Sequence, residues 1–439
     1  MQTEYAMNAS MNAVFAEYHR QLLEQYDILA IDTSYGTETA ELQNTAEHLR
    51  RYMNDNFGAG SGARDLLGLS AVDAEAFTVT RLTDGNGSVF ERQAINYMHS
   101  LTGLPEWDTS ASQAQEYEQE SGGISVDDLW QQAMGDLSSQ ELPQRQNEEG
   151  EWEEVALENP ADAVASLRSL GILRLTVENM DSISNASLEA GQRVSDRTLL
   201  QEGSDGMVYG APSAPDKLLF REYLFQKLGC YTKAKEDSAL QYQVEYLLNG
   251  DLDDFSNLEK TANKLCMLRF LFNYQFLVGN AVKKAEIKTV ALALTAVTLK
   301  PELEPLVSKT LQFAWAYVES VQDVKRLLAG GKVPLKKTDA DWQSQLANLA
   351  EFNKHLSGDN GGRGMDYPGY LRIFACLTPD ETLSRRAMDM VEADIRLTPG
   401  NESFRLDACI IRLDAGVSVE SGAESYFIRR KFSYESTGQ

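Results

Sequence analysis

Cations are scarce in this sequence. Its 439 residues include 40 Lys and Arg against 66 Asp and Glu, which gives a formal net charge of −26 at pH 7. A surface with this excess of negative charge repels the phosphates of nucleic acids and anionic lipid headgroups. The composition therefore argues against nucleic acid as a partner, and we expect none.

Cysteine and histidine are also scarce, with four of each. The cysteines lie far apart in apolar stretches, and neither a CxxC pair nor a nearby pair of histidines occurs, which argues against a zinc site. Buried free thiols are the simplest interpretation, and one long-range disulfide stays open because spacing does not exclude it. We therefore predict no metal and no cofactor. The residues are Cys230, Cys266, Cys376, Cys409, His19, His48, His99 and His355.

Catalytic signatures such as HExxH and GxSxG do not occur. Asp27 and Asp32 flank a predicted strand, and glycosidases pair two carboxylates, but Asp32 is better explained as the start of a turn. Asp251–Asp254 lacks the Gly and Glu positions of an EF-hand loop. Ser357–Gly364 is rich in glycine but lacks the lysine of a P-loop. We predict no catalytic residues and no enzymatic activity.

Long apolar runs are absent too. No run reaches the roughly 20 residues that span a bilayer, and the nearest, Leu265–Val278, is interrupted by polar residues. The first residues, Met1–Tyr5, lack the basic and apolar regions of a signal peptide. The chain as given is expected to be soluble, either as a cytosolic protein or as the part that follows a removed anchor.

A long helix is predicted at the N-terminus, over Met7–Gln25. Apolar residues recur there at spacings of three and four and form a narrow stripe. No capping residue clearly opens this helix, so we expect it to be part of a longer helix. The stripe is the candidate interaction surface, formed by Met7, Met11, Phe15, Tyr18 and Leu22.

Strands are predicted near both ends of the chain. Asp27–Asp32 and Ala76–Leu82 are short and apolar, with helices predicted over Leu42–Phe57 and from Ser88 onward. The C-terminal region alternates apolar and polar residues over Cys409–Val419 and again over 426–434, which is typical of a hairpin. An isolated hairpin is marginal in water, so the four strands are expected to form one sheet with helices on one face.

The segment 106–158 is strongly acidic, with 15 Asp or Glu and one basic residue. Such a segment resists collapse, and we predict a mobile linker or surface loop with one short helix near Val126–Met134. An irregular region with a strand at Leu173–Val177 follows, and Gly203–Pro215 is predicted to be a loop.

The middle of the chain has helical periodicity from Lys217 to Leu397. The clearest helix carries an apolar face from Val307 to Leu328 and is closed by two glycines. Further helices are predicted over Asp237–Leu248, Leu258–Val278, Ala285–Leu299, Thr338–Leu356 and Tyr367–Arg396, the last with a break at Leu377–Asp380.

The predicted fold class is therefore α+β, with a long N-terminal helix and a small, mainly antiparallel sheet completed by the C-terminal hairpin. A large all-helical insertion interrupts it. The expected organisation is 1–105 for the first part of the α+β domain, 106–215 for the acidic and irregular region, 216–400 for a helical bundle, and 401–439 for the hairpin that completes the α+β domain.

Several segments resemble an uncharacterised family of clostridial membrane-anchored proteins. Asn12–Gly36 and Lys235–Gly250 carry the most specific likeness. The other similar segments are Ala94–Met98, Trp315–Val321, Leu327–Leu335 and the start of the hairpin at Phe404–Asp407. In layout this family resembles the TadE/TadG-like minor pilins of tight-adherence (type IVc) pili. Members carry an apolar helix directly before the region that begins at Asn12, and this chain lacks it.

The resemblance implies a non-enzymatic, extracytoplasmic ectodomain of a membrane-anchored, pilus- or cell-surface-associated protein. Its expected partners are proteins of pilus assembly or of the cell envelope, bound through the helical stripe, the sheet edge or the bundle. The membrane would be reached through the N-terminal helix that this chain lacks. The alternatives are an extracytoplasmic glycan hydrolase that uses carboxylates near the sheet and a cytosolic helical scaffold.

Overall fold

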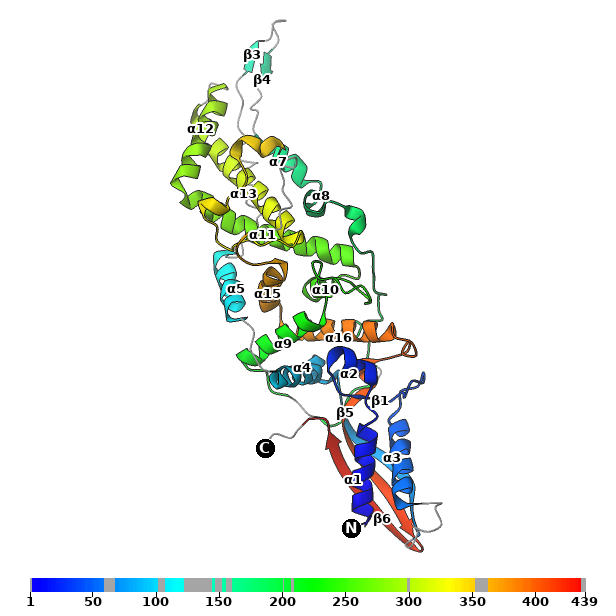
Figure 1. The fold of residues 1–439 in the computed structure, drawn as a ribbon. Coiled ribbons are helices and arrows are strands. Elements are labelled where there is room, and N and C mark those ends of the chain that lie inside the picture. The colour runs from blue at the N-terminus through cyan, green and yellow to red at the C-terminus, as the bar shows by residue number, and fades with distance from the viewer. Residues whose placement is uncertain are drawn as a thin grey trace.

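The molecule is elongated, with a small α+β unit at one end and a helical body stacked beyond it (Figure 1). The structure is a computed structural model. The strands of the main sheet come from opposite ends of the sequence, from residues 31–81 in the first part of the chain and from residues 409–433 in the last. The structure describes residues 2–58, 68–101, 107–121, 144–146, 152–154, 160–199, 201–206, 209–297, 301–351 and 362–435.

The sheet has β5 (Cys409–Ser421) at its centre. β2 (Leu69–Arg81) pairs antiparallel with one side of β5, and β6 (Glu424–Ser433) and β1 (Ile31–Asp32) pair antiparallel with the other. The predicted α+β class and the completion of the sheet by a C-terminal hairpin are confirmed. β1 is shorter than predicted, and β2 begins earlier than the predicted strand.

Alternation of apolar residues explains why β5 and β6 pair in this register. Val417 faces Ile428 and Leu413 faces Phe432, so the apolar side chains of both strands lie on one face. Gly422, in the turn, has φ of 62°, a conformation that costs glycine least.

Two helices cover this apolar face. α1 (Gln2–Phe15) and α3 (Leu42–Phe57) pack on it and form a separate core with the sheet, distinct from that of the helical body (Figure 1). The opposite face of the sheet carries polar residues of β5 such as Asp414 and Ser418, and the 203–206 segment contacts part of it through Ser204 and Asp205.

The predicted N-terminal helix is wrong in its extent. α1 ends at Phe15, and a second helix, α2, covers Arg20–Tyr26. His19 caps α2, because its Nδ1 accepts a hydrogen bond from the Leu22 amide at 3.3 Å, and its own amide donates to the Ala30 carbonyl. These contacts redirect the chain, so that α2 packs in the helical body rather than on the sheet.

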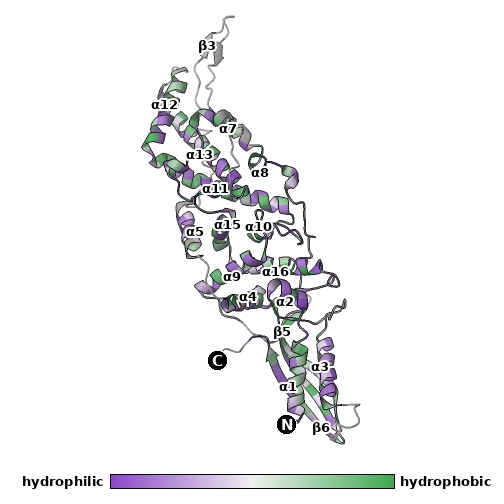
Figure 2. Cartoon of the chain, in the orientation of Figure 1, coloured by the Kyte–Doolittle hydropathy of each residue, from purple (hydrophilic) through white to green (hydrophobic). Residues whose placement is uncertain are grey.

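The helical body is inserted between β2 and β5, as predicted. Figure 2 shows apolar and polar residues alternating around its helices, as expected where each helix buries one face. Its helices are α4 (Ser88–Ser100), α7 (Pro160–Arg168), α8 (Ile172–Thr176), α9 (Ala214–Lys227), α10 (Gln243–Asn249), α11 (Asp254–Gly279), α12 (Ala281–Val297), α13 (Glu304–Leu328), α15 (Tyr367–Leu377) and α16 (Asp380–Arg396). The break before Asp380 is confirmed.

Three predictions in this region are wrong. The helix predicted over Asp237–Leu248 begins only at Gln243, the start of α10. Leu173–Val177 is not a strand, because Ile172–Thr176 forms α8. The helix predicted over Thr338–Leu356 is replaced by two 3₁₀ segments, Asp339–Asp341 and Leu346–Glu351, and residues 352–356 lie outside the described part. The buried Glu319 carboxylate of α13 accepts hydrogen bonds from the amides of Gln343 and Ser344. These bonds hold the chain between the two 3₁₀ segments in a non-helical path.

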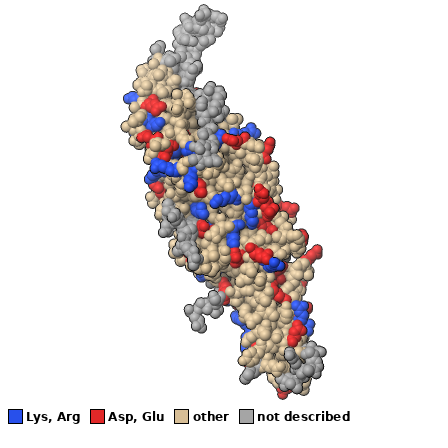
Figure 3. Space-filling view, in the orientation of Figure 1, with Lys and Arg blue, Asp and Glu red and all other residues tan. Residues whose placement is uncertain are grey.

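The acidic segment is partly described. Trp107–Ser121 forms α5, which was not predicted. It packs against α15 and contributes Ala114 and Tyr117 to the core of the helical body. β3 (Gln144–Gln146) and β4 (Trp152–Glu154) pair antiparallel. The helix predicted near Val126–Met134 lies outside the described residues. Elsewhere acidic and basic side chains are interspersed, as the visible face in Figure 3 shows.

Candidate functional site

The structure separates the five residues of the predicted interaction stripe. Met7, Met11 and Phe15 are buried against the sheet, whereas Leu22 is buried in the core of the helical body. Tyr18 lies between the two helices and is 40% exposed. The Tyr434 hydroxyl donates to the carbonyl of Phe15 at 2.5 Å, which fixes the end of α1 against the hairpin. Four of the five side chains therefore contribute to the two cores.

The carboxylates weighed for hydrolysis are both engaged. Asp32 accepts hydrogen bonds from the amide and hydroxyl of Ser34, the turn expected from the sequence. Asp27 forms an ion pair with Lys227 and lines a pocket of about 460 Å³ together with Glu435. Glu435 in turn pairs with Arg412 and accepts from the Tyr209 hydroxyl. Asp27 and Glu435 are thus each paired with a cation of this chain, and Asp32 is held in its own turn.

The histidines that the structure describes each have a polar partner on a different element. His19 contacts Asn401, His48 contacts Glu17, and His99 contacts Asp216, while His355 lies outside the described residues. Within the described ranges, no group of three or more His, Cys, Asp or Glu side chains is placed to hold a metal ion. None of the described helices combines the length and apolarity that a bilayer crossing requires.

An aromatic pair lies on the sheet face opposite α1 and α3. The rings of Phe77 and Phe427 meet edge to face at 5.9 Å, and the Arg429 guanidinium lies 4.3 Å from the centre of the Phe77 ring. Gly416 forms the floor, since a Cβ there would approach Phe427 Cζ to 2.3 Å. Phe427 is 58% exposed, so this pair is an apolar feature on the surface.

β6 forms an edge of the sheet. Among the described strands it pairs with β5 alone, so its outer backbone groups have no strand partner there. Three consecutive cations, Arg429, Arg430 and Lys431, stand on this strand with side chains 50%, 40% and 61% exposed. Each already has a carboxylate partner in the chain: Arg429 pairs with Asp414, Arg430 with Glu4 of α1, and Lys431 with Asp205 and Asp414. With Glu424 as the strand's one acidic residue, β6 is basic within a strongly acidic chain. We call β6 with the Phe77–Phe427 pair the tip surface.

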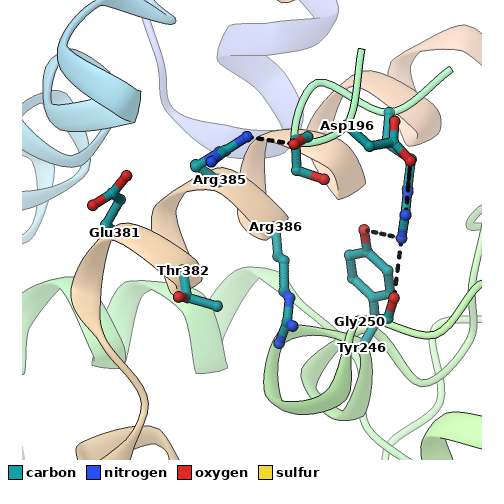
Figure 4. A pocket seen from close by; sticks show the side chains of 9 residues that line it. Asp196, Tyr246, Gly250, Glu381, Thr382, Arg385 and Arg386 are labelled. Carbon is teal, nitrogen blue, oxygen red and sulfur yellow. Dashed lines mark hydrogen bonds and ion pairs between the residues drawn. The ribbon is translucent and has the colours of Figure 1, made fainter. Parts of the chain in front are cut away.

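A second recess, the arginine pocket, lies between the 193–196 segment, the end of α10 and the start of α16. Its volume is about 270 Å³. Figure 4 shows Arg385 reaching from α16 to the segment of Ser195, while Arg386 reaches toward the end of α10 near Gly250. Its lining residues are Arg193, Ser195, Asp196, Tyr246, Gly250, Glu381, Thr382, Arg385 and Arg386.

Hydrogen bonds order the wall of the arginine pocket. The Asp389 carboxylate accepts from the amide and hydroxyl of Ser195 and from the Tyr246 hydroxyl. Arg193 donates to the Gly250 carbonyl at 3.0 Å and forms an ion pair with Asp196 at 2.7 Å. Burial raises the pKa of Asp389, although these donors oppose that rise.

The chain matches a family of unknown function, DUF5702, over residues 150–421, which is more than half of its length. The chain belongs to DUF5702. No curated protein and no solved structure matches it.

The DUF5702 match covers the two candidate surfaces unequally. All residues of the arginine pocket fall inside it. It ends at Ser421, the last residue of β5, so β6 and the early strands β1 and β2 fall outside. The tip surface is thus built mainly from residues beyond the matched part of the chain.

The arginine pocket was not predicted from the sequence. Arg385 and the Ser195 carbonyl to which it donates are 190 positions apart, and no local motif connects them. The sheet edge was expected to bind partners, but neither the aromatic pair nor the cations of β6 were singled out. The run Arg429–Lys431 was the available signal, because a cationic run on an edge strand is unusual in so acidic a chain.

Proposed function

We propose that this DUF5702 protein is a non-enzymatic, extracytoplasmic ectodomain of a membrane-anchored protein associated with a pilus or the cell surface. It acts by binding other proteins of the envelope through the tip surface. The observation that carries the proposal is the outer edge of β6, which is basic, exposed and without a strand partner in the described structure. The resemblance to TadE/TadG-like proteins supports the location.

The occupant we infer is an extended, acidic peptide segment that adds to the sheet beside β6. Strand addition supplies main-chain hydrogen bonds, and alternate side chains supply specificity. Arg430 and Lys431 point to opposite faces of β6, so two adjacent acidic residues of the added strand would pair with them in competition with Glu4 and Asp205, and Phe427 would pack on an apolar residue. Charge disfavours a second copy of β6 in this place, since like charges on neighbouring strands repel.

Location is tested by labelling Phe427→Cys in intact cells with a maleimide that does not cross membranes. Phe427 is 58% exposed, whereas three of the four native thiols are buried, so the unsubstituted protein reports the background. We expect labelling of intact cells above this background. Labelling only after lysis would place the protein inside the cell and overturn the proposed location.

Strand addition is tested on the isolated protein with a ten-residue peptide in which pairs of Glu alternate with pairs of Val, so that both faces of the added strand carry Glu. We expect binding that weakens as salt increases, together with slower amide hydrogen exchange in β6. Replacing both Arg430 and Lys431 with Glu should abolish binding, whereas a double Glu replacement of Arg20 and Arg50, which lie away from β6, should retain it. Equal loss in both variants, or binding of a Lys–Val peptide with the same affinity, contradicts the proposal. A salt-dependent dimer in sedimentation would instead identify a second copy as the occupant.

A further inference from the structure

The arginine pocket goes beyond this proposed function, because it is remote from β6 and built from other elements. We propose that it is a binding site for a small oxyanion, a carboxylate or phosphate group carried by a soluble ligand. Its volume of about 270 Å³ suits an inorganic ion or a ligand the size of an amino acid rather than a larger cofactor.

The first support is that two of its arginines lack a counter-ion. Arg385 donates to the Ser195 carbonyl, and Arg386 donates to the carbonyls of Leu247 at 2.7 Å and Asn249 at 3.3 Å. No carboxylate pairs with either guanidinium among the residues that the structure describes. A guanidinium has five N–H donors, so these bonds leave donors for a ligand on both side chains.

The second support is the charge of the lining. Three arginines stand against two carboxylates, Asp196 and Glu381, which leaves one positive charge in excess in a chain whose net charge is −26. Glu381 precedes Arg385 by four residues on α16, yet no ion pair joins them in the described structure. Burial lowers the pKa of Arg386, although Tyr246 and the Asp389 carboxylate behind the pocket wall oppose this, so a bound anion would further stabilise this cation.

The third support is that the donors are held in place before any ligand arrives. Gly250 has φ of 78°, and a Cβ at this position would lie 2.6 Å from Arg386 Nη2. The absence of a side chain lets the guanidinium lie against the end of α10, where the last carbonyls of the helix attract a cation. Arg193 is fixed by Asp196 and the Gly250 carbonyl. Preorganised donors bind an oxyanion with little ordering cost.

Binding is tested by calorimetry on the whole chain at low ionic strength, with inorganic phosphate and with glutamate as separate probes. We expect saturable one-to-one binding of at least one probe, and comparison of the two distinguishes a phosphate from a carboxylate site. Arg385→Gln should weaken binding at least tenfold. Arg50→Gln, at an exposed position of α3, makes the same change in net charge and should leave the affinity unchanged.

Thr382→Glu provides a second variant that leaves every arginine in place. Its carboxylate would stand three and four residues before Arg385 and Arg386 on α16, the spacing at which helix side chains pair, and would compete with the ligand. We expect loss of binding with an unchanged thermal unfolding midpoint or a higher one. Absence of binding to both probes, unchanged affinity in Arg385→Gln and Thr382→Glu, or equal weakening in Arg50→Gln would each overturn the proposal.

Discussion

The Arg269 guanidinium on α11 and the Asp323 carboxylate on α13 form an ion pair inside the helical body, with Nε and Oδ2 2.9 Å apart and side chains 0% and 3% exposed. Lys337 contacts both Asp323 and Glu319, and the Asn273 amide donates to Asp323 at 3.0 Å. Burial raises the pKa of Asp323, but Lys337 and Arg269 outweigh it and hold that pKa below its usual value. The two longest described helices are thus joined by charge as well as by apolar packing.

Replacing Asp323 with Asn should destabilise the protein strongly. The substitution leaves Arg269 without its counter-ion in the interior, and breaking a buried pair in this way costs about 3–5 kcal/mol. Glu24→Gln is the matched control, because Glu24 and its partner Arg20 on α2 are 54% and 77% exposed, and an exposed pair contributes about 0–1 kcal/mol. Urea unfolding followed by circular dichroism gives both free energies. Similar losses in the two variants would contradict a structural role for the buried pair.

Glu245 on α10 should make stability depend on pH. Burial raises its pKa to about 7 from 4.5, against the opposing hydrogen bonds from the Tyr231 amide and the Tyr367 hydroxyl. The folded state therefore binds this proton more tightly than the unfolded state. Below pH 4.5 the protonated Glu245 makes its full contribution to stability. This contribution is lost as pH rises through 7, and above that pH the free energy of unfolding is lower by roughly 3 kcal/mol.

Glu245→Gln isolates this effect, because glutamine imitates the protonated carboxyl at every pH. We expect the free energy of unfolding of the unsubstituted protein to fall between pH 4.5 and pH 7.5 relative to that of the variant. Other groups titrate alike in both proteins and cancel in the difference. Parallel pH profiles for the two proteins would show that Glu245 stays ionised in the folded state.

The native cysteines should react slowly with an aromatic disulfide reagent. Burial raises the pKa of both Cys230 and Cys266 to about 12, and the thiolate is the reactive form. Cys376 is half-buried and should react first, so Cys376→Ser should remove the fastest phase. When the unsubstituted chain is unfolded in guanidinium, the absorbance of the thiol released by the reagent should show that all four cysteines are free. Fewer than four would indicate the disulfide that the sequence left open.

Phe15 and Tyr18 should respond differently to truncation. Phe15 lies 4.7 Å from the Phe432 ring and 4.8 Å from the Tyr434 ring, measured between centroids, so Phe15→Ala should cost about 3–5 kcal/mol. Tyr18 is exposed, and Tyr18→Ala should change stability by less than about 1 kcal/mol. Thermal unfolding measures both. A large loss for Tyr18→Ala would show that the break between α1 and α2 depends on this side chain.

Local sequence patterns were sufficient for the regular elements. Cys409–Val419 alternates strictly and forms β5, and the apolar face from Val307 to Leu328 lies on α13. Local patterns failed where the element was short. Ile172–Thr176 has three apolar residues among five, which suits a strand or a helix, and periodicity does not separate the two in so few residues.

Of the two candidate sites, the sequence predicted only the sheet edge. The sheet edge was expected because a C-terminal hairpin must pair with the early strands and then leaves an edge. The arginine pocket was not, since Arg193 and Arg386 carry no local signature and meet only when α16 packs beside α10. The same holds for Glu319, whose carboxylate holds 343–344 out of the helix that the local pattern favoured.

The sequence by itself determined the α+β class, the helical insertion and the acidic charge, because these depend on composition and on periodicities read within a few turns. The tertiary structure alone decided where α1 ends, which charges are buried, and that Arg385 and Arg386, which form no ion pair within the described part of the chain, line a pocket. These features depend on polar contacts between distant segments, such as His19 with Asn401 and Arg385 with Ser195. Such contacts exist only after packing has brought their partners together.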